Sequence, residues 1–238
     1  MEDRSLFLFL RCLLAHFIGD FPFQTNEIYR LKNLSLWGQF LHSQIVALTI
    51  LALGWPYLGD LRFWWYAGFI AVTHGVQDQF KVVHLNRRMG QFWPLLIDQG
   101  IHVLLIAIVL LIPFGPPPQA SLHPLLRWYW NDRLVILATG LIASSFMGLY
   151  VLDAFRVSHF SQSQRFPSPG VRDRFNANYG LLERTLITAA MVFCPVGYVA
   201  APLLLLPRLC IKRLRFVVDA LLNLWYAGCI GFLLRLLW

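Results

Sequence analysis

Long runs of apolar residues alternate with short polar connections along the chain, and this pattern predicts membrane-spanning helices. A span needs about 20 mostly apolar residues. Six segments meet or approach this length, and they cover residues 5–21, 36–55, 63–83, 93–113, 134–155 and 216–238. The pattern therefore predicts an all-α fold, a polytopic transmembrane helix bundle with about six spans.

A seventh apolar stretch, 181–206, is interrupted by Pro195, Gly197 and Pro202. One interpretation is a re-entrant hairpin that folds back near residue 195, since a broken backbone at membrane depth is tolerated where protein covers it. A single Pro-kinked crossing is the alternative. We expect one membrane domain in two halves: residues 1–114 contain four spans, and residues 115–238 contain the fifth span, a basic loop, the broken segment and the last span.

Composition agrees with a membrane environment. Of the 238 residues, 58% are hydrophobic and only 13% are charged, and the mean hydropathy is +0.58, whereas soluble domains average about 25% charged residues. The net charge of +8 arises from short basic runs between apolar spans rather than from one basic face, so nucleic-acid binding is not predicted. The four cysteines form no CxxC motif, so neither a thiolate zinc site nor a disulfide framework is indicated.

The basic runs also predict an orientation, because short loops rich in Lys and Arg stay in the cytoplasm. Connections 30–32, 81–88 and 156–174 hold most of these residues, which places them inside and the N-terminus outside. The basic cluster 208–215 stays inside only if segment 181–206 folds back. We therefore predict an integral membrane protein.

Three predicted spans each contain an Asp and a His four residues apart, although ionisable residues are rare in spans. Such a pair lies on one face of a helix. The first and third spans run inward and the fourth runs outward, and the order of the pair is reversed in the fourth. The carboxylates therefore fall at one depth and these imidazoles one turn deeper. With a histidine of the second span, the predicted layer consists of His16, Asp20, His42, His74, Asp78, Asp98 and His102.

A divalent metal ion would stabilise such a layer. Three carboxylates in a low-dielectric bundle repel one another and need compensation, of which Lys81, on the face of His74 and Asp78, would supply part. Imidazole and carboxylate ligands without thiolate suit Zn, Mn or Fe. Because seven candidate ligands exceed the four of tetrahedral zinc, one or two ions are expected, and all seven residues of the layer are candidate ligands. The alternative is a set of hydrogen bonds that only fasten the helices together.

The motifs of these spans resemble an uncharacterised bacterial integral-membrane family, a domain of unknown function. Its pattern is similar to HxxxDFxxQ at 16–24, a lone histidine at 42, HxxxDxxK at 74–81 and DQxxH at 98–102. The resemblance covers roughly the first 105 residues. Further along, residues 178–184 are similar to a Gly/Leu-Glu-Arg signature of longer members. The resemblance implies a membrane fold with a polar centre, in a bacterial inner membrane, and supplies no activity.

The predicted layer favours a membrane-embedded, metal-dependent hydrolase that opens to the cytoplasmic face. The metal would lower the pKa of a bound water toward 7. Asp98 would serve as general base, and Lys81 would stabilise developing negative charge. We expect membrane lipids as partners and a lipid or lipid-linked molecule as substrate.

Two other functions stay open from the sequence. An ion- or proton-coupled transporter, or a metal-ion transporter, would use the same carboxylates, and a broken 181–206 segment resembles the discontinuous helices of transporters. A homodimer would then supply the inverted repeat that one chain lacks. In a non-catalytic membrane assembly factor, the polar layer would only specify helix packing.

Overall fold

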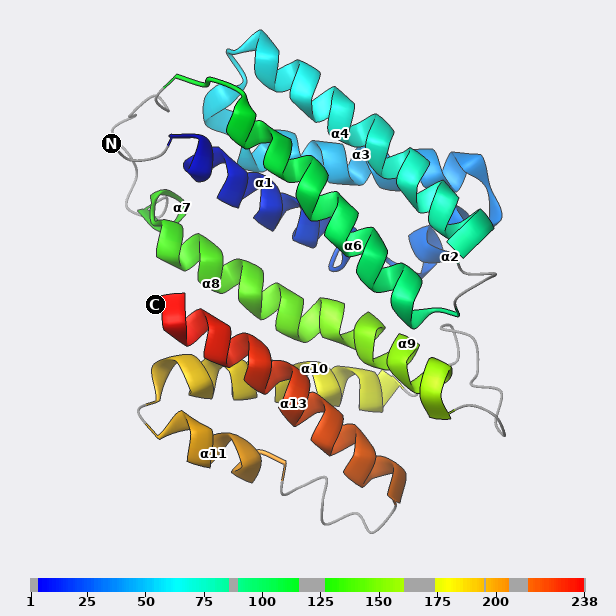
Figure 1. Ribbon diagram of the computed structural model, residues 1–238, viewed down its shortest axis with the longest axis vertical. Coiled ribbons are helices and arrows are strands. Elements are labelled where there is room, and N and C mark those ends of the chain that lie inside the picture. The colour runs from blue at the N-terminus through cyan, green and yellow to red at the C-terminus, as the bar shows by residue number, and fades with distance from the viewer. Residues whose placement is uncertain are drawn as a thin grey trace. The chain divides into compact units, whose positions relative to one another are not determined.

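The computed structural model describes residues 4–85, 90–115, 127–160, 174–194, 196–205 and 214–237, and every regular element in this part of the chain is a helix (Figure 1). The all-α prediction is therefore confirmed for the described residues. Much of the predicted basic connections, at 86–88, 161–173 and 208–213, lies outside them. The chain forms two compact units, Met1–Val135 and Ile136–Trp238. The predicted division at residue 114 stays a prediction.

The helices of the first unit coincide closely with the first four predicted spans. These helices are α1 (Arg4–Asp20), α3 (Leu36–Leu53), α4 (Leu61–Phe80) and α6 (Phe92–Ala107). Shorter elements join or extend them, namely α2 (Asn26–Leu34), η1 (Trp55–Tyr57), η2 (Lys81–Leu85), η3 (Ile108–Leu111) and α7 (Arg127–Trp130). The sequence analysis assigned no helix to residues 26–34.

Side-chain caps fix where three of these helices begin. Thr25 accepts a hydrogen bond from the Ile28 amide at the start of α2, and Ser35 does the same for Gly38 at the start of α3. Asp60 caps α4 in this way. These residues satisfy amides that have no partner within the helix. The neighbouring Arg62 guanidinium holds the pKa of the partly exposed Asp60 carboxyl below its usual value.

Small residues let the helices of the first unit approach closely. A Cβ atom on Gly19 of α1 would lie 3.0 Å from the Cα of Val46 in α3. A Cβ atom on Gly38 would lie only 2.1 Å from the Leu31 carbonyl carbon of α2. Such contacts between small residues are typical of membrane helices. The two glycines allow α1 and α2 to pack closely against α3. This packing positions the polar side chains described below.

In the second unit one long helix contains an internal π-helical turn. Helix α8 (Asp132–Ile142) continues through η5 (Ala143–Met147) into α9 (Gly148–Phe160). The remaining helices are α10 (Arg174–Phe193), α11 (Gly197–Leu203) and α13 (Leu214–Leu237). A π-turn interrupts the regular hydrogen-bond ladder and leaves backbone carbonyls to be satisfied by other groups.

The chain folds back between α10 and α11, as the hairpin interpretation of 181–206 predicts (Figure 1). A Cβ atom on Gly197 would lie 2.1 Å from the Ala190 carbonyl oxygen, so this glycine allows α11 to turn tightly against α10. Ala201 and Leu205 then share an apolar core with Ile187. The position of this hairpin in a membrane stays a prediction.

Among the described residues, four helices are long and apolar enough to cross a membrane. They span Leu36–Leu53, Phe92–Leu111, Asp132–Ser158 and Val217–Leu237. This finding is consistent with a membrane protein. The count of about six spans, the external N-terminus and the bacterial inner membrane stay predictions.

Candidate metal centre

The first unit brings together all seven residues of the predicted layer. They come from the second half of α1, the first half of α3, the second half of α4 and the middle of α6. Each side chain is buried, with at most 4% of its residue surface exposed. We call this set the His/Asp centre, and it consists of His16, Asp20, His42, His74, Asp78, Asp98 and His102.

Asp20 and Asp78 face two histidines from opposite sides. The Nε2 atom of His42 lies 2.9 Å from Asp20 Oδ1 and 3.5 Å from Asp78 Oδ2. The Nε2 atom of His74 lies 3.5 Å from Asp20 Oδ1, and its Nδ1 atom lies 3.6 Å from Asp78 Oδ2. Helices α1, α3 and α4 therefore present two carboxylates and two imidazoles to one small space.

The imidazoles of the three Asp–His pairs also cluster, as their spacing predicts. The rings of His74 and His102 have centroids 4.2 Å apart. His16 lies 5.0 Å from His102 and 5.5 Å from His74 by the same measure. The four-residue spacing on three helices thus places three rings side by side.

Two glutamines and Lys81 orient the carboxylates. Gln99 donates from Nε2 to Asp20 Oδ2 at 2.7 Å, and its Oε1 lies 3.3 Å from His16 Nε2. Gln77 donates to the Asp98 backbone carbonyl at 2.6 Å. The Lys81 ammonium lies 2.9 Å from Asp78 Oδ1 and also contacts Asp98 Oδ2. The predicted pairing of Lys81 with this layer is therefore present in the structure.

Lys32 contacts the His/Asp centre and is not among the residues predicted from the sequence, because it falls in a basic connection. It lies on α2 and is the only buried residue of that helix. Its Nζ atom lies 2.9 Å from Asp78 Oδ2. The capping residue Thr25 could have indicated the start of a helix. The chain reversal that brings α2 to Asp78 of α4, however, is not visible in the hydrophobic pattern of the sequence.

Five imidazole nitrogens of the centre have no hydrogen-bond partner among the described residues. They are Nδ1 of His16, Nδ1 of His42, both nitrogens of His74 and Nε2 of His102. Buried polar atoms without a partner are rare, and each costs about 1–3 kcal/mol. The separations of 3.5 and 3.6 Å at His74 exceed the usual hydrogen-bond range. Ligand atoms about 2.0–2.2 Å from a tetrahedral ion lie roughly 3.3–3.6 Å from one another, so the 3.5 Å between His74 Nε2 and Asp20 Oδ1 suits two ligands of one cation.

The potential ligand atoms form two overlapping groups, and within each group all lie within 4.8 Å of one another. One group contains Asp20, His42, His74 and Asp78, and the other contains His16, Asp20 and His102. Asp20 belongs to both. Of the predicted ligands, only Asp98 belongs to neither of these groups, and Lys81 engages it instead.

The formal charges of the centre leave room for a cation. With neutral histidines, the carboxylates of Asp20, Asp78 and Asp98 exceed the ammonium groups of Lys32 and Lys81 by one negative charge. Uncompensated charge in a buried site is costly. The excess carboxylate and the unpartnered nitrogens therefore both favour a bound positive ion.

The second unit contains a separate buried polar network around Glu183 and Arg184, the pair of the 178–184 motif. The guanidinium of Arg184 donates to the carbonyls of Ser144 and Ser145 in the π-turn η5, at 2.9 and 2.7 Å, and to Asn223 Oδ1 at 2.8 Å. Asn223 in turn donates to Glu183 at 2.7 Å. This network satisfies the carbonyls that the π-turn leaves open.

No curated protein and no solved structure matches the chain. Residues 8–125 match the model of a family described as "Protein of unknown function (DUF3307)". The matched range contains every residue of the His/Asp centre and both lysines. Through these residues, about half of its length, the chain belongs to this uncharacterised family.

Proposed function

We propose that the His/Asp centre binds a divalent metal ion and that the protein is a membrane-embedded, metal-dependent hydrolase. The observation that carries this proposal is His74, which is fully buried and has both ring nitrogens unpartnered between Asp20 and Asp78. A histidine that only fastened helices together would use at least one nitrogen in a hydrogen bond. A metal ligand needs a free nitrogen aimed at other ligands.

The donor set limits which ions fit. In one group Asp20, Asp78, His42 and His74 supply two carboxylates and two imidazoles. In the other group Asp20, His16 and His102 supply one carboxylate and two imidazoles. Imidazole with carboxylate suits Zn, Mn or Fe. The two ligand groups share Asp20, so one ion in either group or two ions bridged by Asp20 are both accommodated.

Residues beside the ligands supply the remaining requirements of hydrolysis. A divalent ion in such a site makes water a better nucleophile at neutral pH and polarises the substrate. Asp98 lies outside both ligand groups, and its carboxylate, which Lys81 contacts through Oδ2, is the general base that we propose. The Lys81 ammonium contacts Asp98, where it would stabilise negative charge that develops on the substrate.

The substrate that we propose is a lipid or a lipid-linked molecule at the cytoplasmic face. The proposed topology has about six spans, an external N-terminus and α10–α11 as a re-entrant hairpin in a bacterial inner membrane. Helix α2 supports this location, because it buries only Lys32 and is followed by exposed Leu36, Trp37 and Phe40. Exposed aromatic residues beside a polar site are typical of the membrane interface.

The metal content of the purified full-length protein tests the proposal. After equilibration with Zn, Mn or Fe and removal of loosely bound ions, we expect one or two ions per chain, measured by mass spectrometry of the elements. Asp20→Asn should lose them, because Asp20 belongs to both ligand groups. Asp219→Asn is the matched control, since Asp219 is a buried carboxyl paired with Arg156 in the second unit.

Three results would count against the proposal. A folded wild-type chain that retains none of these metals would remove the metal site. Equal retention by wild type and Asp20→Asn would place the metal elsewhere. A metal-loaded protein that leaves esters and phosphoesters of lipids intact, but moves protons or metal ions across vesicle membranes, would replace hydrolysis with transport.

A further inference from the structure

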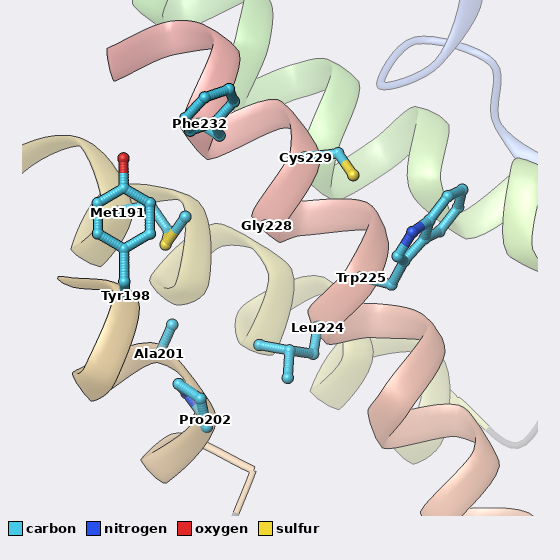
Figure 2. A pocket seen from close by; sticks show the side chains of 9 residues that line it. All are labelled: Met191, Tyr198, Ala201, Pro202, Leu224, Trp225, Gly228, Cys229 and Phe232. Carbon is cyan, nitrogen blue, oxygen red and sulfur yellow. The ribbon is translucent and has the colours of Figure 1, made fainter. Parts of the chain in front are cut away.

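The second unit carries an open apolar groove between α10, α11 and α13 (Figure 2). Its volume is about 410 Å³, within the range of about 300–1,000 Å³ that is usual for ligand sites. The lining residues are Met191, Tyr198, Ala201, Pro202, Leu224, Trp225, Gly228, Cys229 and Phe232. This groove is independent of the His/Asp centre and of the proposed function.

Small side chains leave open space in the groove. A Cβ atom added to Gly228 would meet no atom within 4 Å, so the space beside this glycine is open. Ala201 lies across from it on α11 (Figure 2). From Leu224 to Phe232 the groove follows α13 for about 12 Å, at 1.5 Å per residue. Its shape is therefore long and its surface apolar.

A positive charge lies at one end of this groove. The guanidinium of Arg235, in the last turn of α13, lies 5.1 Å from the centre of the Tyr198 ring. Its Nη1 donates to the carbonyl oxygens of Met191 and Cys194, at 3.0 and 2.9 Å. Carbonyls orient the guanidinium but do not neutralise it, and no carboxylate in the described part of the chain pairs with it.

We infer that this groove binds an anionic phospholipid, with an acyl chain along α13 and the phosphate at Arg235. The apolar length of the groove matches an acyl chain, and the guanidinium matches a phosphate in charge and geometry. Segment Val217–Leu237 is long and apolar enough to span a membrane, and an arginine in the last turn of such a helix lies at headgroup level.

Native mass spectrometry of the full-length protein in detergent tests this inference. Phosphatidylglycerol and phosphatidylcholine with identical acyl chains are added separately. We expect phosphatidylglycerol to bind about fivefold more tightly, because one surface arginine contributes about 1 kcal/mol toward an anionic lipid. Arg235→Gln, which removes the positive charge, should abolish this difference.

Gly228→Leu should weaken the binding of both lipids, because the leucine fills the groove. Gly68→Leu is the matched control: Gly68 in α4 also faces open space but lies in the first unit. Arg30→Gln, on exposed α2, controls for the loss of one positive charge. Circular dichroism of each variant verifies that the helices are retained.

Equal affinity of the wild type for the two lipids would overturn the inference, as would unchanged lipid binding by Gly228→Leu. A lipid-independent dimer that Gly228→Leu dissociates would assign the groove to a second copy of the chain instead.

Discussion

The two units each bury a polar layer among apolar helices, but the two layers are satisfied in different ways. In the second unit, the Arg184 guanidinium, Asn223 and the Ser144 hydroxyl all have hydrogen-bond partners, and Ser144 shares a 2.6 Å hydrogen bond with Thr188. In the His/Asp centre, five imidazole nitrogens have none among the described residues. The polar groups of the Arg184 network have their partners within the protein, whereas the His/Asp centre has nitrogen atoms that could still bind a ligand.

This difference separates a layer that holds helices together from one that is built for a ligand. A fully satisfied buried network stabilises and specifies the fold. A network with unpartnered buried atoms stabilises the fold less than a fully satisfied one. Such a loss of stability is expected at functional sites. The contrast therefore predicts that substitutions in the two layers change different properties, namely stability in the second unit and metal binding in the first.

The largest effect is expected for Arg184→Met. This change leaves the Ser144 and Ser145 carbonyls and the Asn223–Glu183 pair without the buried guanidinium. Breaking a buried charged network by removing one partner costs about 3–5 kcal/mol. The free energy of unfolding, measured by denaturant titration in detergent micelles, should fall by this amount.

The folded molecules of Arg184→Met should retain as many metal ions per chain as the wild type. A loss of less than about 1 kcal/mol, the range of an exposed ion pair, would show that the network contributes little. Thr139→Ala is the control. Thr139 lies in α8, about one turn before η5, so this substitution changes the helix that Arg184 contacts but keeps the guanidinium.

The outline of the fold could be predicted from the sequence, because apolar length alone locates membrane helices. The predicted segments 36–55 and 216–238 closely match α3 and α13. The convergence of the Asp–His pairs was also predictable, since it follows from a spacing of four and alternating helix direction. The division of the ligands into two groups that share Asp20 could be found only from the distances between their atoms in the structure.

Other features depend on tertiary structure and could not be read from the sequence. Lys32 reaches Asp78 only because the chain reverses after α1 and packs α2 on Gly38. The π-turn η5 lies in a sequence that reads as continuous helix. The carbonyls that it exposes are occupied by Arg184, from a helix about 40 residues further along. Side chains distant in sequence therefore decide which polar groups have partners.

A moderate effect is expected for Lys32→Met. The Lys32 ammonium occupies Asp78 Oδ2 at 2.9 Å, and this oxygen also faces His42 and His74. Removing the ammonium frees a potential ligand oxygen and takes a like charge away from the metal. The affinity for the metal, measured by competition with a chelator, should rise about tenfold, because neighbouring charges commonly shift such equilibria by about 1.4 kcal/mol.

Arg30→Met is the control for Lys32→Met, because Arg30 lies on the same helix with an exposed side chain. Its metal affinity should equal that of the wild type. Weaker metal binding by Lys32→Met would mean that the ammonium organises the ligands instead of competing with the ion.

The smallest effect on stability is expected for His74→Leu in the metal-free protein, although His74 is fully buried. A leucine fills a similar volume, and the imidazole makes only long contacts, of 3.5 and 3.6 Å, with Asp20 and Asp78. Replacing an unsatisfied polar group by an apolar one of similar shape is close to neutral or stabilising. The free energy of unfolding without metal should therefore change by less than about 1 kcal/mol, whereas the stabilisation that added metal gives the wild type should disappear in the variant. A large loss of stability without metal would instead make His74 a structural residue like Arg184, and the distinction between the two polar layers would no longer hold.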